Sequence, residues 1–188
     1  MKYFQEFQYN VIASDVKRKV EAIISGSKPD YTKERLGQLF SMLDITTLSE
    51  QDNSESIGIL CDKINMLSDS YPELPSPAAL CIYPEMVAIV KSKLDNPMVN
   101  IASVGGGFPA SQTFIEVKKQ EVEMAIEEGA EEIDIVLSIG KFQIGLYEEV
   151  FNELKQIKNI MGPLHLKVIL ETGSQHNLSE VRKASMLA

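Results

Sequence analysis

Two ionisable side chains interrupt apolar segments of the sequence, and they are its strongest candidates for chemistry. Lys167 lies in the apolar segment 164–170, and Asp134 lies in the apolar segment 132–137. Burial destabilises the charged form of a lysine, and a neutral amine is the nucleophile of Schiff-base chemistry. Each residue also has a structural explanation. A lysine can reach solvent from a strand end or pair with a carboxylate, and a buried acid can pair with a backbone donor or a lysine. Because both groups are expected on neighbouring strands, we favour a catalytic role for Asp134.

Weaker candidates lie in or just after other apolar segments. Asp44 precedes Thr46 in a polar stretch, where an aspartate commonly caps a turn. Cys81 has no neighbouring histidine to activate it, so it fits a small buried hydrophobic residue better than a nucleophile. Three glycines at positions 105–107 could hold a phosphate, but they lack the spacing of the dinucleotide-binding and P-loop motifs.

The placement of these residues depends on five short segments that are expected to form strands. These segments are 40–44, 78–83, 99–104, 132–137 and 164–170. Helical patterns at 54–67, 85–94, 111–129 and 147–160 separate them, and Asn177 followed by Glu180 is typical of a capped helix start. Strands that alternate with helices indicate βαβ units and a parallel sheet, and near-continuous apolar strands indicate a sheet buried on both faces.

The spacing of the strands favours a barrel. Those expected near 99, 132 and 165 start 33 residues apart, which suits a (β/α) barrel of the TIM type, with a doubly wound sheet as the alternative. A closed TIM barrel needs eight strands, and the sequence provides five. The helical pattern still continues at Ala188. We therefore expect an α/β fold, an incomplete TIM-type barrel of about five βα units, whose remainder is missing or is supplied by another chain.

The first 39 residues show a different pattern. Apolar residues recur at helical spacing in the segment 9–24, and Thr32 can cap a short helix that ends near Leu39. We expect residues 1–39 to form an N-terminal helical layer and residues 40–188 to form the partial barrel.

Composition excludes several classes of function. The chain has 188 residues and a net charge of −9, which argues against nucleic-acid binding. No apolar run reaches membrane-spanning length, so no membrane partner is expected. Two cysteines without a secretion signal suggest reduced thiols and a cytoplasmic protein. The only histidines, His165 and His176, are expected at the surface, and no metal-binding motif occurs.

Five segments, in this order, resemble one known family. They are Leu43-Asp44-Ile45-Thr46-Thr47-Leu48, Cys81-Ile82-Tyr83-Pro84, Gly107-Phe108-Pro109, Glu132-Ile133-Asp134-Ile135-Val136 and Leu166-Lys167-Val168-Ile169-Leu170-Glu171-Thr172-Gly173. The chain is similar here to the deoxyribose-phosphate aldolases, which are class I, Schiff-base aldolases on a TIM barrel. The family reversibly cleaves 2-deoxyribose 5-phosphate to acetaldehyde and glyceraldehyde 3-phosphate, without a metal or an organic cofactor.

The resemblance implies a role for each candidate. Asp134 matches the family's proton-relay aspartate, and Lys167 matches a lysine close to the reacting carbon that is not the Schiff-base lysine. Asp44, Thr46 and Cys81 match positions that line the substrate pocket. The family's Schiff-base lysine lies on the sixth strand and its phosphate loops follow strands six to eight, all beyond the five strands found here. The implied partners are a small phosphorylated sugar and further copies of the chain in a homo-oligomer.

Three functions remain open from the sequence. The first is an aldolase whose remaining part lies elsewhere, in which case residues 1–188 alone are expected to be inactive. The second is a catalytically dead half-barrel that serves as an assembly or binding module. The third keeps catalysis within these residues and makes Lys167 itself the Schiff-base nucleophile.

Overall fold

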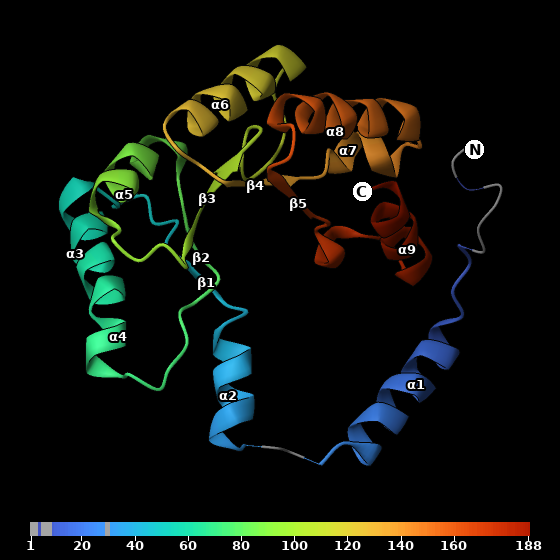
Figure 1. The fold of residues 1–188 in the computed structure, drawn as a ribbon. Helices are drawn as coiled ribbons and strands as arrows, with labels where there is room; N and C mark the ends of the chain where they lie inside the picture. The colour runs from blue at the N-terminus through green and yellow to red at the C-terminus, as the bar shows by residue number, and fades with distance from the viewer. Residues whose placement is uncertain (1–3, 5–8, 29–30) are drawn as a thin grey trace.

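The computed structural model describes Phe4, residues 9–28 and residues 31–188, and its centre is one parallel sheet (Figure 1). The strands are β1 (Asp44–Thr46), β2 (Ala79–Ile82), β3 (Asn100–Gly105), β4 (Glu132–Val136) and β5 (His165–Ile169). They pair in sequence order, β1-β2-β3-β4-β5, and every pair is parallel. This order is that of successive βα units in a TIM-type barrel, as the strand spacing predicted.

Side chains alternate between two faces of the sheet. Large aliphatic residues such as Leu80, Ile101 and Ile133 belong to the main core on the outer face. The inner face carries a smaller cluster of buried residues, Ala79, Cys81, Ala102 and Val104. Large residues therefore face the helices and small residues face inward, which leaves room on the inner face for polar side chains.

Helices cover the outer face of the sheet in sequence order (Figure 1). The main ones are α3 (Ser54–Asn65), α5 (Val87–Lys93), α6 (Ile115–Glu127), α8 (Tyr147–Met161) and α9 (Leu178–Leu187). The side chain of Asn53 caps α3, and the side chain of Asn177 accepts a hydrogen bond from the Glu180 backbone at the start of α9, as the sequence predicted.

Short helical segments join the larger elements. They are α4 (Leu67–Ser70), α7 (Ile139–Gln143) and the 3₁₀ turns η2 (Pro84–Met86) and η3 (Thr172–Ser174). The sequence did not predict α7, although its Phe142 side chain is fully buried. The first strand begins at Asp44 rather than at Phe40, because Phe40 ends the preceding helix.

One expectation about the sheet is wrong. We expected the strand that contains Lys167 to be buried on both faces, but the residues of β5 are only half-buried and His165 is exposed. Within the described residues β5 pairs with β4 alone, so one edge of it has no partner strand.

Two helices precede the sheet and lie on the side of it opposite to α6 and α8 (Figure 1). These are α1 (Ala13–Gly26) and α2 (Lys33–Phe40), and neither contains a buried residue. Thr32 caps α2 by accepting a hydrogen bond from the Arg35 backbone. The N-terminal segment also contacts the last helix, because the Val11 backbone donates to Ser179 Oγ at 2.9 Å. The division into residues 1–39 and 40–188 remains a prediction.

Among the described residues, no helix combines the length and the apolar character needed to cross a membrane.

Candidate active site on the inner face of the sheet

Strand register places the two principal candidates next to each other. Val104 on β3 is aligned with Asp134 on β4, which is aligned with Lys167 on β5. In a parallel pair, aligned residues project from the same face of the sheet. Val104 belongs to the inner cluster, so Asp134 and Lys167 also project from the inner face.

The Lys167 side chain forms ion pairs with two carboxylates. Its Nζ lies 2.9 Å from Asp134 Oδ2 and also contacts the carboxylate of Asp44. Asp134 is 7% exposed, whereas the Lys167 side chain is 43% exposed. Asp44 is the first residue of β1, yet it reaches the third residue of β5. Strands in a barrel are tilted and staggered along its axis. The start of β1 can therefore lie beside the middle of β5.

The two carboxylates determine the charge state of Lys167. Burial alone would lower the pKa of Lys167, but hydrogen bonds to Asp44 and Asp134, and the charges of both, outweigh burial and raise the pKa. Lys167 therefore pairs with carboxylates, which is the structural alternative to a neutral nucleophile at this position. Lys167 is an ammonium group at neutral pH, which can orient oxygen atoms and donate protons but cannot attack a carbonyl carbon.

Two opposing effects act on the pKa of Asp134. Burial raises the pKa of Asp134, and the hydrogen bond and charge of Lys167 only partly offset this increase. Its Oδ1 atom is buried and accepts no hydrogen bond from any described residue. A carboxylate with a raised pKa and one unused oxygen can accept a proton from a bound molecule and return it.

Cys81 lies beside Asp134, and its thiol is unreactive at neutral pH. Its Sγ atom is 3.8 Å from Asp134 Oδ2, and the residue is 3% exposed. Burial and the negative charge of Asp134 raise the pKa of Cys81 to about 12. The thiol therefore stays protonated at neutral pH, in agreement with its expected role as a small buried residue.

The structure also shows which groups the polar residues near β1 contact. Asp44 was expected to cap a turn, but its carboxylate contacts Lys167 instead. The turn is held by Asp52, which accepts hydrogen bonds from Thr47 Oγ1 at 2.8 Å and from the Ser49 backbone at 3.0 Å. Thr46 is exposed, and its hydroxyl donates to the Asp44 carbonyl at 3.3 Å.

In the glycine-rich loop after β3, the Gly107 amide is already bound to a carboxylate. Gly106 and Gly107 adopt positive φ angles of 65° and 77°. A Cβ atom on Gly107 would lie 2.8 Å from Thr113 Cγ2, so glycine is required there by space as well as by conformation. The Gly107 amide donates to Glu121 Oε2 at 2.8 Å. The carboxylate of Glu121 beside the Gly107 amide disfavours an anion there. The sequence did not indicate this contact, which only the folded loop shows.

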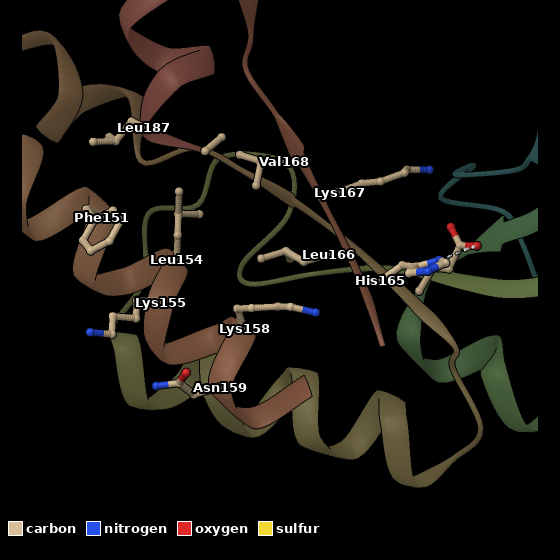
Figure 2. Close-up of a pocket in the computed structure, with 12 residues that line it drawn as sticks. Phe151, Leu154, Lys155, Lys158, Asn159, His165, Leu166, Lys167, Val168 and Leu187 are labelled. Carbon is tan, nitrogen blue, oxygen red and sulfur yellow. Dashed lines mark ion pairs between the residues drawn. The ribbon is translucent and has the colours of Figure 1, made fainter. Parts of the chain in front are cut away.

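A groove runs along the free edge of β5 (Figure 2). Its volume is about 620 Å³, and its apolar lining includes Leu154, Leu166 and Val168. In Figure 2, Lys167 points away from Leu166 and Val168, which face α8. The strand edge and the groove together form an open apolar surface next to the inner-face site.

Both histidines are exposed, as predicted. Among the described residues, no group of three or more histidine, cysteine, aspartate or glutamate side chains is arranged to hold a metal ion.

Comparison with sequences of known proteins gives consistent matches. A family model described as DeoC/LacD family aldolase matches residues 41–185. Deoxyribose-phosphate aldolase from Homo sapiens is 35% identical over 171 residues, which cover 86% of this chain and 54% of the relative. Deoxyribose-phosphate aldolase from Mycoplasmopsis pulmonis is 37% identical over 150 residues, which cover 80% of this chain and 64% of the relative. The chain spans about half the length of the human relative and less than two thirds of the bacterial one.

Solved structures share the fold. QR15, an aldolase, superposes with a TM-score of 0.69 at 28% identity, over 79% of this chain and 62% of that chain. Deoxyribose phosphate aldolase from Aeropyrum pernix, described as a unique tetrameric structure, superposes with a TM-score of 0.61 at 25% identity, over 79% of this chain and 60% of that chain. The five parallel strands therefore correspond to part of a TIM-barrel aldolase fold.

Proposed function

The chain belongs to the DeoC/LacD family of aldolases, and from this premise we propose that it supplies one part of the active site of a deoxyribose-phosphate aldolase. The proposed reaction is the reversible cleavage of 2-deoxyribose 5-phosphate to acetaldehyde and glyceraldehyde 3-phosphate through a lysine Schiff base. The observation that carries the proposal is the contact of Lys167 with Asp134 and Asp44 on the inner face of the sheet.

The geometry supports separate roles for these residues. Asp134 is the proposed proton relay, since its buried Oδ1 is unused and its pKa is raised by burial. Lys167 is the proposed source of positive charge beside the reacting carbon, where it stabilises developing negative charge on oxygen. Asp44 holds Lys167 in place, and Thr46 and Cys81 line the sugar pocket on the same face.

The Schiff-base nucleophile is proposed to lie outside residues 1–188. Two carboxylates keep Lys167 protonated, and a protonated amine has no lone pair for attack on a carbonyl. Phosphate contacts are proposed to come from the same missing part, because the Gly107 amide already binds Glu121. The free edge of β5 and its apolar groove are the surface on which this part would continue the sheet.

An assembly or binding module without catalysis is the second candidate. The unpaired edge of β5 favours it, because a free strand edge beside an apolar groove can bind another polypeptide whether or not chemistry follows. The proposal that Lys167 is itself the nucleophile is the weakest of the three, since it conflicts with the two ion pairs.

Acetaldehyde release from 2-deoxyribose 5-phosphate tests the proposal. The assay uses the 188-residue chain alone and the chain mixed with the portion of the Mycoplasmopsis pulmonis relative that follows its match. The expected result is no turnover by the chain alone and measurable turnover by the mixture. A matched mixture that contains Asp134→Asn should lose about 10²- to 10⁴-fold in turnover, the usual contribution of a general acid-base group.

Two other outcomes would overturn the proposal that the chain supplies one part of an aldolase active site. Association of the two polypeptides without turnover, measured by sedimentation, would favour the binding module. Substantial turnover by the 188-residue chain alone would show that the nucleophile lies within it.

A further inference from the structure

A second cluster of charged residues is buried in the helical layer, away from Lys167. Lys118 on α6 is 2% exposed, although it is a lysine. Its Nζ contacts Ser111 Oγ at 2.7 Å, Ser138 Oγ at 3.0 Å and Glu153 Oε2 at 3.2 Å. Glu153 belongs to α8, which lies next to α6 on the outside of the sheet (Figure 1). We refer to Lys118, Glu153, Ser111 and Ser138 as the Lys118 cluster.

The hydrogen bonds of the Lys118 cluster are complete. The ammonium group of Lys118 has three N–H donors and three acceptors. Glu153 also accepts from Ser138 Oγ at 2.6 Å and from Lys141 Nζ at 2.6 Å. Burial would raise the pKa of Glu153, but these hydrogen bonds and the charge of Lys118 outweigh burial and lower it. With every donor of Lys118 used, the cluster has no need of a ligand.

The cluster connects the helical layer to the ends of two strands. Ser138 follows β4, the strand of Asp134. Ser111 lies in the loop after β3, where it has a φ of 57° and donates its backbone N–H to the Gly107 carbonyl at 2.8 Å. The residues from Gly106 to Gln112 form this loop, which we call the β3 loop. Lys118 donates a hydrogen bond to Ser111 at the end of the β3 loop. Glu121, on the same helix, accepts one from the Gly107 amide at the beginning of the loop.

The β3 loop covers part of the inner face. Its Phe108 ring lies 6.2 Å from the Tyr83 ring, centroid to centroid, in an edge-on arrangement. Phe108 and Tyr83 both pack on the buried inner cluster that contains Cys81. Cys81 in turn contacts Asp134. Phe108 of the β3 loop therefore covers part of the inner cluster to which Cys81 belongs.

We propose that the Lys118–Glu153 ion pair is a positioning device that holds the β3 loop, so that Phe108 stays packed on the inner cluster that contains Cys81. A buried ion pair adds little net stability compared with an apolar pair of similar size, but its directional bonds specify one arrangement of the groups around it. The cluster thus fixes a loop of the inner face from the opposite side of the sheet. This assignment does not depend on aldolase activity.

Alkylation of the native protein tests the proposal, because the chain has two buried cysteines that report on different regions. Cys81 belongs to the inner cluster on which Phe108 of the β3 loop packs, whereas Cys61 is fully buried on α3. The rates at both thiols are measured in the same sample with iodoacetamide and peptide mass spectrometry. One variant is Ser111→Ala, which removes the contacts of the loop hydroxyl with Lys118 and Ser138 and leaves the ion pair in place. The other is the double variant Lys118→Met with Glu153→Met, which removes both charges together.

Each variant should increase the alkylation rate of Cys81 roughly tenfold, which is about what the loss of one or two hydrogen bonds does to a local opening equilibrium. The rate at Cys61 should stay within about twofold of the parent. Lys119→Met is the matched control, because Lys119 is the next residue on α6 and forms only a surface ion pair with Glu116. It should leave both rates unchanged.

A parallel increase at both cysteines would show that the cluster only contributes to global stability, and it would overturn the proposal. An unchanged rate at Cys81 in Ser111→Ala would overturn it as well. Because Ser111→Ala leaves the ion pair intact, its result remains informative even where the double variant fails to fold.

Discussion

Asp134→Asn should stabilise the chain at neutral pH, although it removes the proposed proton relay. Asp134 is 7% exposed and its Oδ1 has no hydrogen-bond partner. The asparagine is neutral and has nearly the same shape, and its carbonyl oxygen can still accept from Lys167. Lys167 also keeps its ion pair with Asp44. The variant therefore removes a buried charge without leaving an unpaired one behind.

The two energetic contributions determine the size of the effect. The buried charge of Asp134 costs about 1–3 kcal/mol more than a neutral amide in the same place. Loss of the attraction to the partly exposed Lys167 costs about 0.2–1 kcal/mol. The free energy of unfolding should therefore rise by about 1 kcal/mol, and the melting temperature of a chain of this size should rise by about 2–4 °C.

The pH dependence provides a second signature. The pKa of Asp134 is raised above its unfolded value of 3.8, so the folded chain binds more protons than the unfolded chain between these two values. The stability of the parent should fall as the pH rises through this window, whereas the variant lacks the effect. The advantage of Asp134→Asn should therefore shrink as the pH is lowered and disappear below pH 3.8.

Thermal melts and urea titrations of both chains between pH 8 and about pH 3 measure the prediction, since this range extends below the unfolded pKa of 3.8. Asp44→Asn is the matched control, because Asp44 contacts the same lysine but is more exposed, and it should not stabilise the chain. A loss of more than about 1 kcal/mol in Asp134→Asn at pH 7 would refute the reasoning, since it would make the ion pair with Lys167 a net structural contribution.

Two further substitutions test other parts of the structure. Lys167→Met leaves two carboxylates without their shared cation, so it should reduce the free energy of unfolding at pH 7 by about 1–2 kcal/mol, and the loss should diminish in urea titrations at acid pH as Asp134 is protonated. Gly107→Ala should cost about 1–3 kcal/mol in the same titrations, because φ is positive and the new methyl group would meet Thr113, whereas Gly140→Ala in α7 meets no neighbouring atom and should gain about 0.5–1 kcal/mol. A stabilised Lys167→Met, or equal effects of the two glycine substitutions, would contradict these assignments.

The sequence predicted four of the five strands closely, because their apolar segments are short and bounded by turn residues. It did not predict that Asp44 contacts Lys167, because the two residues are 123 positions apart and meet only through the stagger of the strands. The sequence therefore left both a neutral nucleophile and a paired lysine open, and the contacts with two carboxylates favour the paired, charged form. The period of an apolar segment also does not distinguish a central strand from an edge strand, and β5 is an edge within the described chain.

Other features depend on contacts that no local pattern reveals. Asp44 and Asp52 both flank the same turn, and only the fold shows that Asp52 holds it. Helix α7 has five residues, too few to show a helical period. Lys118 and Lys119 are adjacent and chemically identical, yet only Lys118 faces the interior. Its burial follows from the side of α6 that meets α8.

Borohydride trapping of the reconstituted barrel tests the central claim most directly. The 188-residue chain and the complementing polypeptide are mixed, incubated with 2-deoxyribose 5-phosphate, reduced with sodium borohydride and mapped by peptide mass spectrometry. We predict a reduced adduct on a lysine of the complementing polypeptide and none on Lys167, which its two carboxylates keep protonated. An adduct on Lys167 would contradict the account and would place the nucleophile within this chain.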